Sequence, residues 1–227
     1  MSTKLPQSHS RPHTQTHRAT ADHLLDTRGY SGSSIRGQNP AHLLEKPVRE
    51  RIIDCYYFRE QCFGLNEATL CDRAEELTSI GGSYGDGASP KPSPFLCLVF
   101  KLLQLQPERA IVLEYLHQRE LKYLTALAAF YVRLTFDSKD VYGTLEPLLE
   151  DLRKLRHRTK AGVKLTFVDQ FVDDLLTKDR VCGTSLWKLK RREDLEIGER
   201  SSPLAAELDS GSEDDEHSDH SGDGRDM

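Results

Sequence analysis

The sequence lacks any apolar run long enough to cross a membrane. Its longest candidate, from Tyr123 to Val132, is far shorter than the ~20 residues that span a bilayer, so we expect no transmembrane helix. A charged start followed by an apolar stretch is also missing, and we therefore expect no secretory signal. The five cysteines are an odd number without paired spacing. They do not resemble a disulfide framework and favour a reducing compartment, the cytosol or the nucleus.

Motifs for catalysis and metal binding are missing as well. Cys55, Cys62 and Cys71 stand seven and nine residues apart, without the Cys-x-x-Cys or paired histidines that a structural metal site uses. We interpret Cys55, Cys62 and Cys97 as core thiols, because each lies among apolar residues. The glycine-rich stretch 81–87 lacks the Gly-Lys-Ser/Thr of a phosphate-binding loop. His117 falls on the polar side of a predicted helix, which is typical of a solvated face. The sequence therefore predicts no enzyme, no cofactor and no metal.

Charge is distributed unevenly along the 227 residues. The net charge is −5, but residues 198–227 hold ten acidic residues and two arginines, a balance of −8, which leaves +3 for residues 1–197. A segment of this composition cannot bury a core, so we predict a disordered acidic tail at 198–227. Ser210 and Ser212 precede a run of acidic residues and resemble sites for an acid-directed kinase. A purely solubilising tail is compatible with that interpretation.

The first 38 residues are rich in Ser, Thr, His, Gly and Arg, and the first 21 contain bases but no acid. Mitochondrial transit peptides share that composition, but this segment lacks the apolar helical face that such a peptide needs. We therefore predict a disordered extension at 1–38 and a folded domain at 39–197.

Apolar residues recur at helical spacing through most of the folded domain. Asn39, Asn66 and Ser93 are placed to cap helices. Helices are predicted to start at these caps and at Pro107, and to cover 48–63, 121–136, 145–155 and 168–176. One short hairpin arm is predicted from Val163 to Leu165. Strand–helix alternation is missing, which argues against a Rossmann-type sheet. The fold class predicted is all-α, a single irregular helical bundle with one long Gly/Pro-rich loop and disordered termini.

The core of this bundle is expected to contain large apolar residues from three of the predicted helices. They are Phe95, Leu98, Leu102, Leu124, Phe130, Leu134 and Phe171.

A long loop of turn residues extends from Gly81 to Pro92. Tyr84 stands there among glycines. A tyrosine has a large apolar face and one hydrogen-bonding tip, which makes it a frequent interface anchor. It can equally fold back and pin the loop onto the bundle, and the sequence leaves both interpretations open. The candidate partner-binding residues are Gly82, Tyr84, Gly85, Pro92 and Phe95.

A window without acidic residues begins within the last part of the predicted helix 145–155 and extends beyond it. Its bases are Arg153, Lys154, Arg156, Arg158, Lys160 and Lys164. Such a cluster can bind phosphates by releasing counterions, although it lacks interleaved aromatic residues for stacking on bases. Three interpretations stay open: contact with RNA or a nucleoprotein, a solvated helix end, and contact with an acidic protein partner.

Several motifs occur in one order from about Asn39 to about Arg192, and together they resemble the pre-mRNA-splicing factor 38 family. They include Gln61-Cys62-Phe63-Gly64, Gly81-Gly82-Ser83-Tyr84-Gly85, Pro92-Ser93-Pro94-Phe95-Leu96-Cys97-Leu98, Leu103-Gln104-Leu105-Gln106-Pro107-Glu108, Tyr131-Val132-Arg133-Leu134-Thr135, Leu145-Glu146-Pro147-Leu148, Val168 to Leu176 and Arg180-Val181-Cys182.

The resemblance implies an α-helical, non-enzymatic scaffold of the spliceosome, located in the nucleus and required when the tri-snRNP-containing complex is activated. It implies contacts with a zinc-finger protein and a microfibrillar-associated-type protein, no cofactor, and a monomer outside the complex. Long Arg-Ser-rich tails of animal relatives are replaced here by a short acidic tail, so tail contacts do not carry over. The alternative is a helical RNA-binding protein that acts through the 153–164 cluster.

Overall fold

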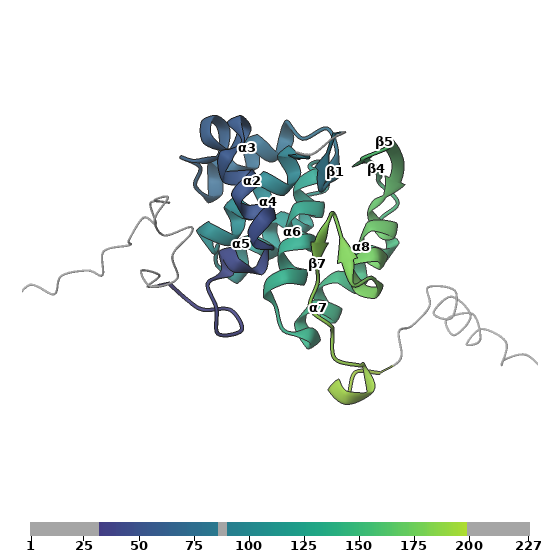
Figure 1. The fold of residues 1–227 in the computed structure, drawn as a ribbon. Coiled ribbons are helices and arrows are strands. Elements are labelled where there is room, and N and C mark those ends of the chain that lie inside the picture. Colours follow the sequence, from purple (N-terminus) through teal and green to yellow (C-terminus); the bar gives the residue numbers. More distant parts are fainter. Residues whose placement is uncertain (1–31, 86–89, 199–227) are drawn as a thin grey trace, which may run out of the picture. The chain divides into compact units, whose positions relative to one another are not determined.

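The computed structural model describes residues 32–85 and 90–198 (Figure 1). The chain divides into two compact units, residues 1–189 and 190–227. The described part of the second unit contains one short 3-10 helix, η5 (Glu193–Leu195). The predicted disorder of residues 1–31 and 199–227, which include Ser210 and Ser212, lies outside the described residues.

The first unit consists mainly of helices. They are η2 (Pro40–Leu43), α2 (Lys46–Asp54), the π-helical turn η3 (Phe58–Cys62), α3 (Glu67–Glu75), α4 (Pro94–Leu105), α5 (Arg109–His117), α6 (Lys122–Thr135), α7 (Ser138–Leu145), η4 (Glu146–Glu150) and α8 (Val168–Thr177). None of the described helices is long and apolar enough to cross a membrane.

Three of the predicted helix starts are confirmed by their caps. The Asn66 side chain accepts a hydrogen bond from the Thr69 N–H at 2.8 Å, and the Thr69 hydroxyl accepts one from the Asn66 N–H, which completes a capping box. The Ser93 hydroxyl accepts a hydrogen bond from the Leu96 N–H at 3.1 Å, before the proline that opens α4. Asn39 caps the short η2.

The core is built around α6, which contacts α3, α4, α5, α7 and α8 and lies among them in Figure 1. Three aromatic rings meet there, with centroids 6.1 Å apart for Phe95 and Phe130, 6.2 Å for Phe95 and Phe171, and 6.4 Å for Phe130 and Phe171. All seven residues predicted for the core are buried. The predicted central position of helix 121–136 is confirmed.

The predicted all-α class is wrong, because the domain is mixed and contains three small sheets. The strands are β1 (Ile80–Gly81), β2 (Ser83–Tyr84), β3 (Lys91–Pro92), β4 (Lys154–Thr159), β5 (Gly162–Phe167), β6 (Arg180–Val181) and β7 (Thr184–Ser185). In the largest sheet β4 lies between β1, which is parallel to it, and β5, which is antiparallel. The pairs β2–β3 and β6–β7 are antiparallel.

The hairpin β4–β5 is longer than the predicted arm and replaces the end of a predicted helix. The helix expected at 145–155 is wrong: α7 ends at Leu145, η4 accommodates Pro147, and Leu155 belongs to β4. Leu155 is buried between two exposed bases, which is the two-residue alternation of a strand. Because Leu155 also fits the preceding leucine spacing, the sequence pattern favoured a helix.

The helix predicted at 48–63 is interrupted. Helix α2 ends at Asp54, and Cys55 adopts an extended conformation before the turn η3. As a result, Tyr56 and Phe63, which were expected on the apolar side, are 77% and 51% exposed.

Candidate interaction surface

The glycine-rich loop is held against two other segments by close backbone approach. Gly81 has φ +150° and pairs with Arg158 of β4, and a Cβ atom at Gly81 would lie 2.5 Å from the Arg158 carbonyl oxygen. A Cβ atom at Gly82 would overlap the carbonyl oxygen of Cys182. Glycine is required at both positions because no side chain fits there. The segment is therefore packed against the rest of the domain at Gly81 and Gly82.

Tyr84 contacts the basic cluster. The Arg158 guanidinium lies over the Tyr84 ring, 4.5 Å from its centroid, in the geometry of a cation–π interaction. Tyr84 also pairs with Lys91 across β2–β3. One ring face is thus covered from within the domain, as the pinning interpretation requires. The structure brings together two candidate sets that the sequence treated separately.

The other candidate partner-binding residues differ in their accessibility. Gly82 and Pro92 are buried, and Gly85 is exposed. Phe95 is fully buried in the aromatic core, so its side chain is a packing residue. The accessible part of this candidate set consists of Tyr84 and Gly85.

A cavity of about 420 Å³ lies beside Tyr84. Tyr84 and Tyr56 contribute aromatic surface to it, and the cavity is lined by Arg51, Asp54, Cys55, Tyr56, Tyr57, Tyr84, Pro90, Lys91 and Pro92. We call this cavity the tyrosine cavity. The α2 side of this cavity was not predictable from the sequence, because the break at Cys55 that turns Tyr56 outward has no glycine or proline to mark it.

The basic cluster lies on the β4–β5 hairpin rather than on a helix end. One face of the hairpin carries Lys154, Arg156 and Arg158 from β4. Opposite Arg156 and Arg158 stand Leu165 and Val163 of β5, which are 63% and 46% exposed. We call this set the hairpin face. It combines cationic and aliphatic side chains, whereas Lys164 lies on the other face with His157.

Two arginines of the cluster make contacts within the domain. Arg158 covers Tyr84, and Arg153 donates hydrogen bonds to the carbonyl oxygens of Gln118 and Arg119 and to the Asp151 carboxylate. Partial burial acts to raise the pKa of Asp151, but its hydrogen bonds with Arg153 leave that pKa lowered. Arg153 therefore has a structural role, which its place in a run of bases did not indicate. Lys154, Arg156, Lys160 and Lys164 are exposed.

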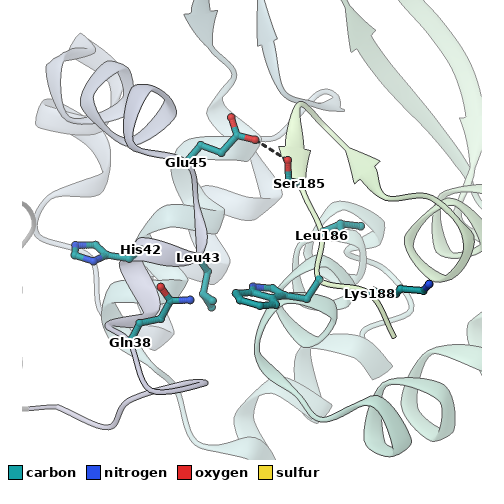
Figure 2. Close-up of a pocket in the computed structure, with 8 residues that line it drawn as sticks. Gln38, His42, Leu43, Glu45, Ser185, Leu186 and Lys188 are labelled. Carbon is teal, nitrogen blue, oxygen red and sulfur yellow. Dashed lines mark hydrogen bonds between the residues drawn. The ribbon is translucent and has the colours of Figure 1, made fainter. Parts of the chain in front are cut away.

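A second cavity, of about 400 Å³, lies between the start and the end of the domain (Figure 2). Glu45 links its two sides by accepting hydrogen bonds from Ser185 at 2.7 Å and from Arg180 at 2.8 Å. The hydrogen bond from Ser185 is the main cause of a lowered pKa at Glu45. Trp187, which is half exposed, lines the cavity, and the Arg36 guanidinium lies 5.5 Å from its ring centroid. The sequence did not predict this cavity, because its sides are distant in the chain.

The cysteines form no metal site in the described residues, where no group of three or more Cys, His, Asp or Glu side chains converges. Cys62 and Cys97 are buried, in line with the prediction of core thiols, whereas Cys55 and Cys71 are half-buried.

Comparison with known proteins gives consistent matches. The model of the PRP38 family matches residues 33–199. Pre-mRNA-splicing factor 38 of Schizosaccharomyces pombe is 48% identical over 186 residues, which cover 82% of this chain and 87% of the relative. The Drosophila melanogaster protein of the same name is 45% identical over 78% of this chain and 53% of its own length. This chain therefore matches about half the length of the fly relative.

A solved structure is also similar. It is a chain of the Snu23-Prp38-MFAP1(217-258) complex of Chaetomium thermophilum, with a TM-score of 0.72 and 52% sequence identity. The match covers 80% of this chain and 100% of that chain.

Proposed function

Since the chain belongs to the PRP38 family of pre-mRNA-splicing factors, we propose that it is a non-enzymatic scaffold that binds other proteins in the spliceosome. The observation that carries the proposal is the similarity to a chain solved in the Snu23-Prp38-MFAP1(217-258) complex, since the match covers the whole of that chain. The names of the relatives describe splicing factors and no enzymatic activity.

The finer proposal concerns partners and timing. The partners would be a zinc-finger protein and a microfibrillar-associated-type protein, as the family resemblance implies and as the composition of the similar complex supports. The protein would act in the nucleus, when the tri-snRNP-containing complex is activated, and would be a monomer outside that complex. The domain that does this would be 39–197, with the extensions 1–38 and 198–227 outside it.

Two surfaces are suited to protein partners. The tyrosine cavity exposes the Tyr56 ring beside the loop that carries Tyr84 and Gly85. Partly exposed aromatic residues in a concave site are typical anchors for a partner side chain. The hairpin face adds aliphatic contact area next to Lys154 and Arg156, which fits a partner segment with apolar and acidic side chains.

A second candidate function is RNA binding through the same hairpin. It is favoured by the exposed Lys154, Arg156, Lys160 and Lys164, which carry four positive charges without an acidic residue between them. Phosphate contacts of this kind give affinity that falls steeply with salt. Contacts with phosphates would not bury the exposed aliphatic side chains of Leu165 and Val163, whereas a protein partner could. We therefore favour the protein partner.

The test is capture of partners from nuclear extract by the tagged full chain, followed by mass spectrometry. We expect the wild-type chain to capture spliceosomal proteins after nuclease treatment, and absence of these proteins would contradict the scaffold proposal. Leu165→Asp should weaken capture if the hairpin face binds protein, and Leu152→Asp is the matched control because Leu152 is a similarly exposed leucine outside the β4–β5 pairs.

In parallel, filter binding of RNA across a salt series should give weak binding. Tight, salt-dependent binding that Lys160→Ala and Lys164→Ala reduce would favour the RNA function.

A further inference from the structure

Two cysteine side chains meet where α2 and α4 contact each other. The Sγ atoms of Cys55 and Cys97 lie 3.6 Å apart. Cys97 belongs to the first turns of α4 and is fully buried, whereas Cys55 follows the end of α2 and is half-buried. A disulfide has an S–S distance of about 2.05 Å, so the two sulfur atoms need to approach by about 1.5 Å to form one.

Cys55 is also accessible to solutes, because it lines the tyrosine cavity. The Phe58 N–H donates a hydrogen bond to its Sγ at 3.4 Å, and Arg59 adds positive charge nearby. These groups stabilise a thiolate at Cys55. The hydrogen bond with Cys97 is the largest cause that lowers the Cys55 pKa to about 7. The pKa values of Cys97, Cys62, Cys71 and Cys182 are all raised, so Cys55 differs from every other cysteine of the chain.

We propose that Cys55 and Cys97 are a peroxide-oxidisable thiol pair in which Cys55 is the reactive residue and Cys97 resolves it into a disulfide. This role is independent of the proposed scaffold function. It requires one accessible thiolate and one adjacent thiol that is shielded from the oxidant, and the geometry at the α2–α4 contact supplies both.

The reaction uses hydrogen peroxide as oxidant. The Cys55 thiolate attacks one peroxide oxygen, the O–O bond breaks, and the departing hydroxide takes up a proton to become water, which leaves Cys55 as a sulfenic acid. The Cys97 sulfur then attacks the Cys55 sulfur. The S–O bond breaks, and the hydroxide leaves as water with the Cys97 proton. In total two thiols are oxidised to one disulfide while one peroxide is reduced to two waters. A thiol reductant reverses the modification.

The disulfide would connect the end of α2 to the start of α4. It closes the chain segment that contains η3, α3 and the glycine-rich loop, and it removes the free thiol from the wall of the tyrosine cavity. Oxidation therefore changes the chemistry of this cavity without adding a bulky group.

The test uses the full chain, first reduced and then treated with hydrogen peroxide. Remaining thiols are blocked with N-ethylmaleimide before trypsin digestion and mass spectrometry. Trypsin places Cys55 in the peptide 52–59 and Cys97 in the peptide 74–101, because Lys91 precedes a proline. We expect these two peptides to be linked, with loss of about 2 Da. Cys71 is the internal control, since it is also half-buried, and it should carry N-ethylmaleimide.

Two variants separate the roles of the pair. In Cys97→Ala, treated with peroxide at pH 9.0 so that Cys55 is still partly ionised, the Cys55 sulfenic acid should persist and react with dimedone. In Cys55→Ser the peptide with Cys97 should stay reduced. The pH midpoint for alkylation of Cys55 should lie near 7 in the wild-type chain and move toward the ordinary value of 9.0 in Cys97→Ala. The proposal is overturned if wild-type Cys55 stays reduced while Cys71 oxidises, or if Cys55 links to a cysteine other than Cys97.

Discussion

The guanidinium of Arg158 covers the ring of Tyr84 at 4.5 Å from its centroid. This contact joins β2 to β4, and it lies next to the backbone pairing of Gly81 with Arg158. The loop and the hairpin are therefore parts of one surface. A substitution of Tyr84 or of Arg158 is expected to affect both the loop and the hairpin.

The Tyr84–Arg158 contact predicts a stability effect. Tyr84→Ala should lower the free energy of unfolding by about 1 kcal/mol, since a partly exposed cation–π contact contributes about that much. Urea unfolding measures it, and a double-mutant cycle with Arg158→Ala should show coupling between the two changes. Tyr56→Ala is the control, because Tyr56 is 77% exposed and should leave stability unchanged. Unchanged stability of Tyr84→Ala together with weaker partner capture would instead favour the role as an interface anchor.

Substitution by alanine is predicted to have opposite effects on stability at Gly82 and at Gly143. Gly82→Ala should destabilise the fold by about 1–3 kcal/mol, because its Cβ overlaps the Cys182 carbonyl oxygen and the backbone has to move. Gly143→Ala should stabilise it by about 0.5–1 kcal/mol, since Gly143 lies within α7 and a Cβ there meets nothing within 4 Å. Thermal melting distinguishes the two, and similar shifts in both variants would contradict the close approach at Gly82.

Burial of Leu124 in α6 predicts a large loss of stability on truncation. Leu124→Ala should lower the free energy of unfolding by about 2–5 kcal/mol, because it leaves a cavity in a packed core. Leu152→Ala is the matched control, since the Leu152 side chain is 71% exposed and should change little. A loss near zero for Leu124→Ala would mean that α6 is not central to the core.

The lowered pKa of Cys55 predicts a pH dependence of stability in the reduced protein. The folded state loses the Cys55 proton near pH 7, and the unfolded state keeps it up to about 9.0, so the unfolded state binds more protons in this window. The contribution of Cys55 to stability therefore rises with pH between 7 and 9. Melting temperatures with a reductant present should rise relative to those of Cys55→Ser over this range. A constant difference between the two proteins would contradict the shifted pKa.

Local signals in the sequence predicted a large part of the fold. The side chains of Asn66 and Ser93 accept hydrogen bonds from backbone N–H groups three residues later in the chain. A few consecutive residues are therefore enough to identify them as helix caps. The apolar helix 121–136 and the buried Phe95 follow from periodicity alone.

Contacts between distant segments were not predictable in the same way. Leu155 fits both a helical and an alternating pattern, and the choice depends on the pairing of β4 with its two neighbours, β1 and β5. The Glu45–Ser185 hydrogen bond and the Cys55–Cys97 contact each join two residues that are far apart in sequence. The sequence around either residue does not indicate its partner. The candidate site was therefore found in part: Tyr84 and the bases were identified, and their contact was not.

The parallel pairing of β1 with β4 also determines the order in which the domain can be completed. The β4–β5 hairpin and the α5–α6 pair form from contacts between residues that are close in sequence. Ile80 can pair only after the distant His157 has been incorporated into β4. Contacts of such sequence separation form late because a long loop has to close first. During synthesis on the ribosome, Ile80 and Gly81 therefore emerge well before their partner strand does. The docking of this segment onto the finished hairpin is therefore expected to be a late step of folding.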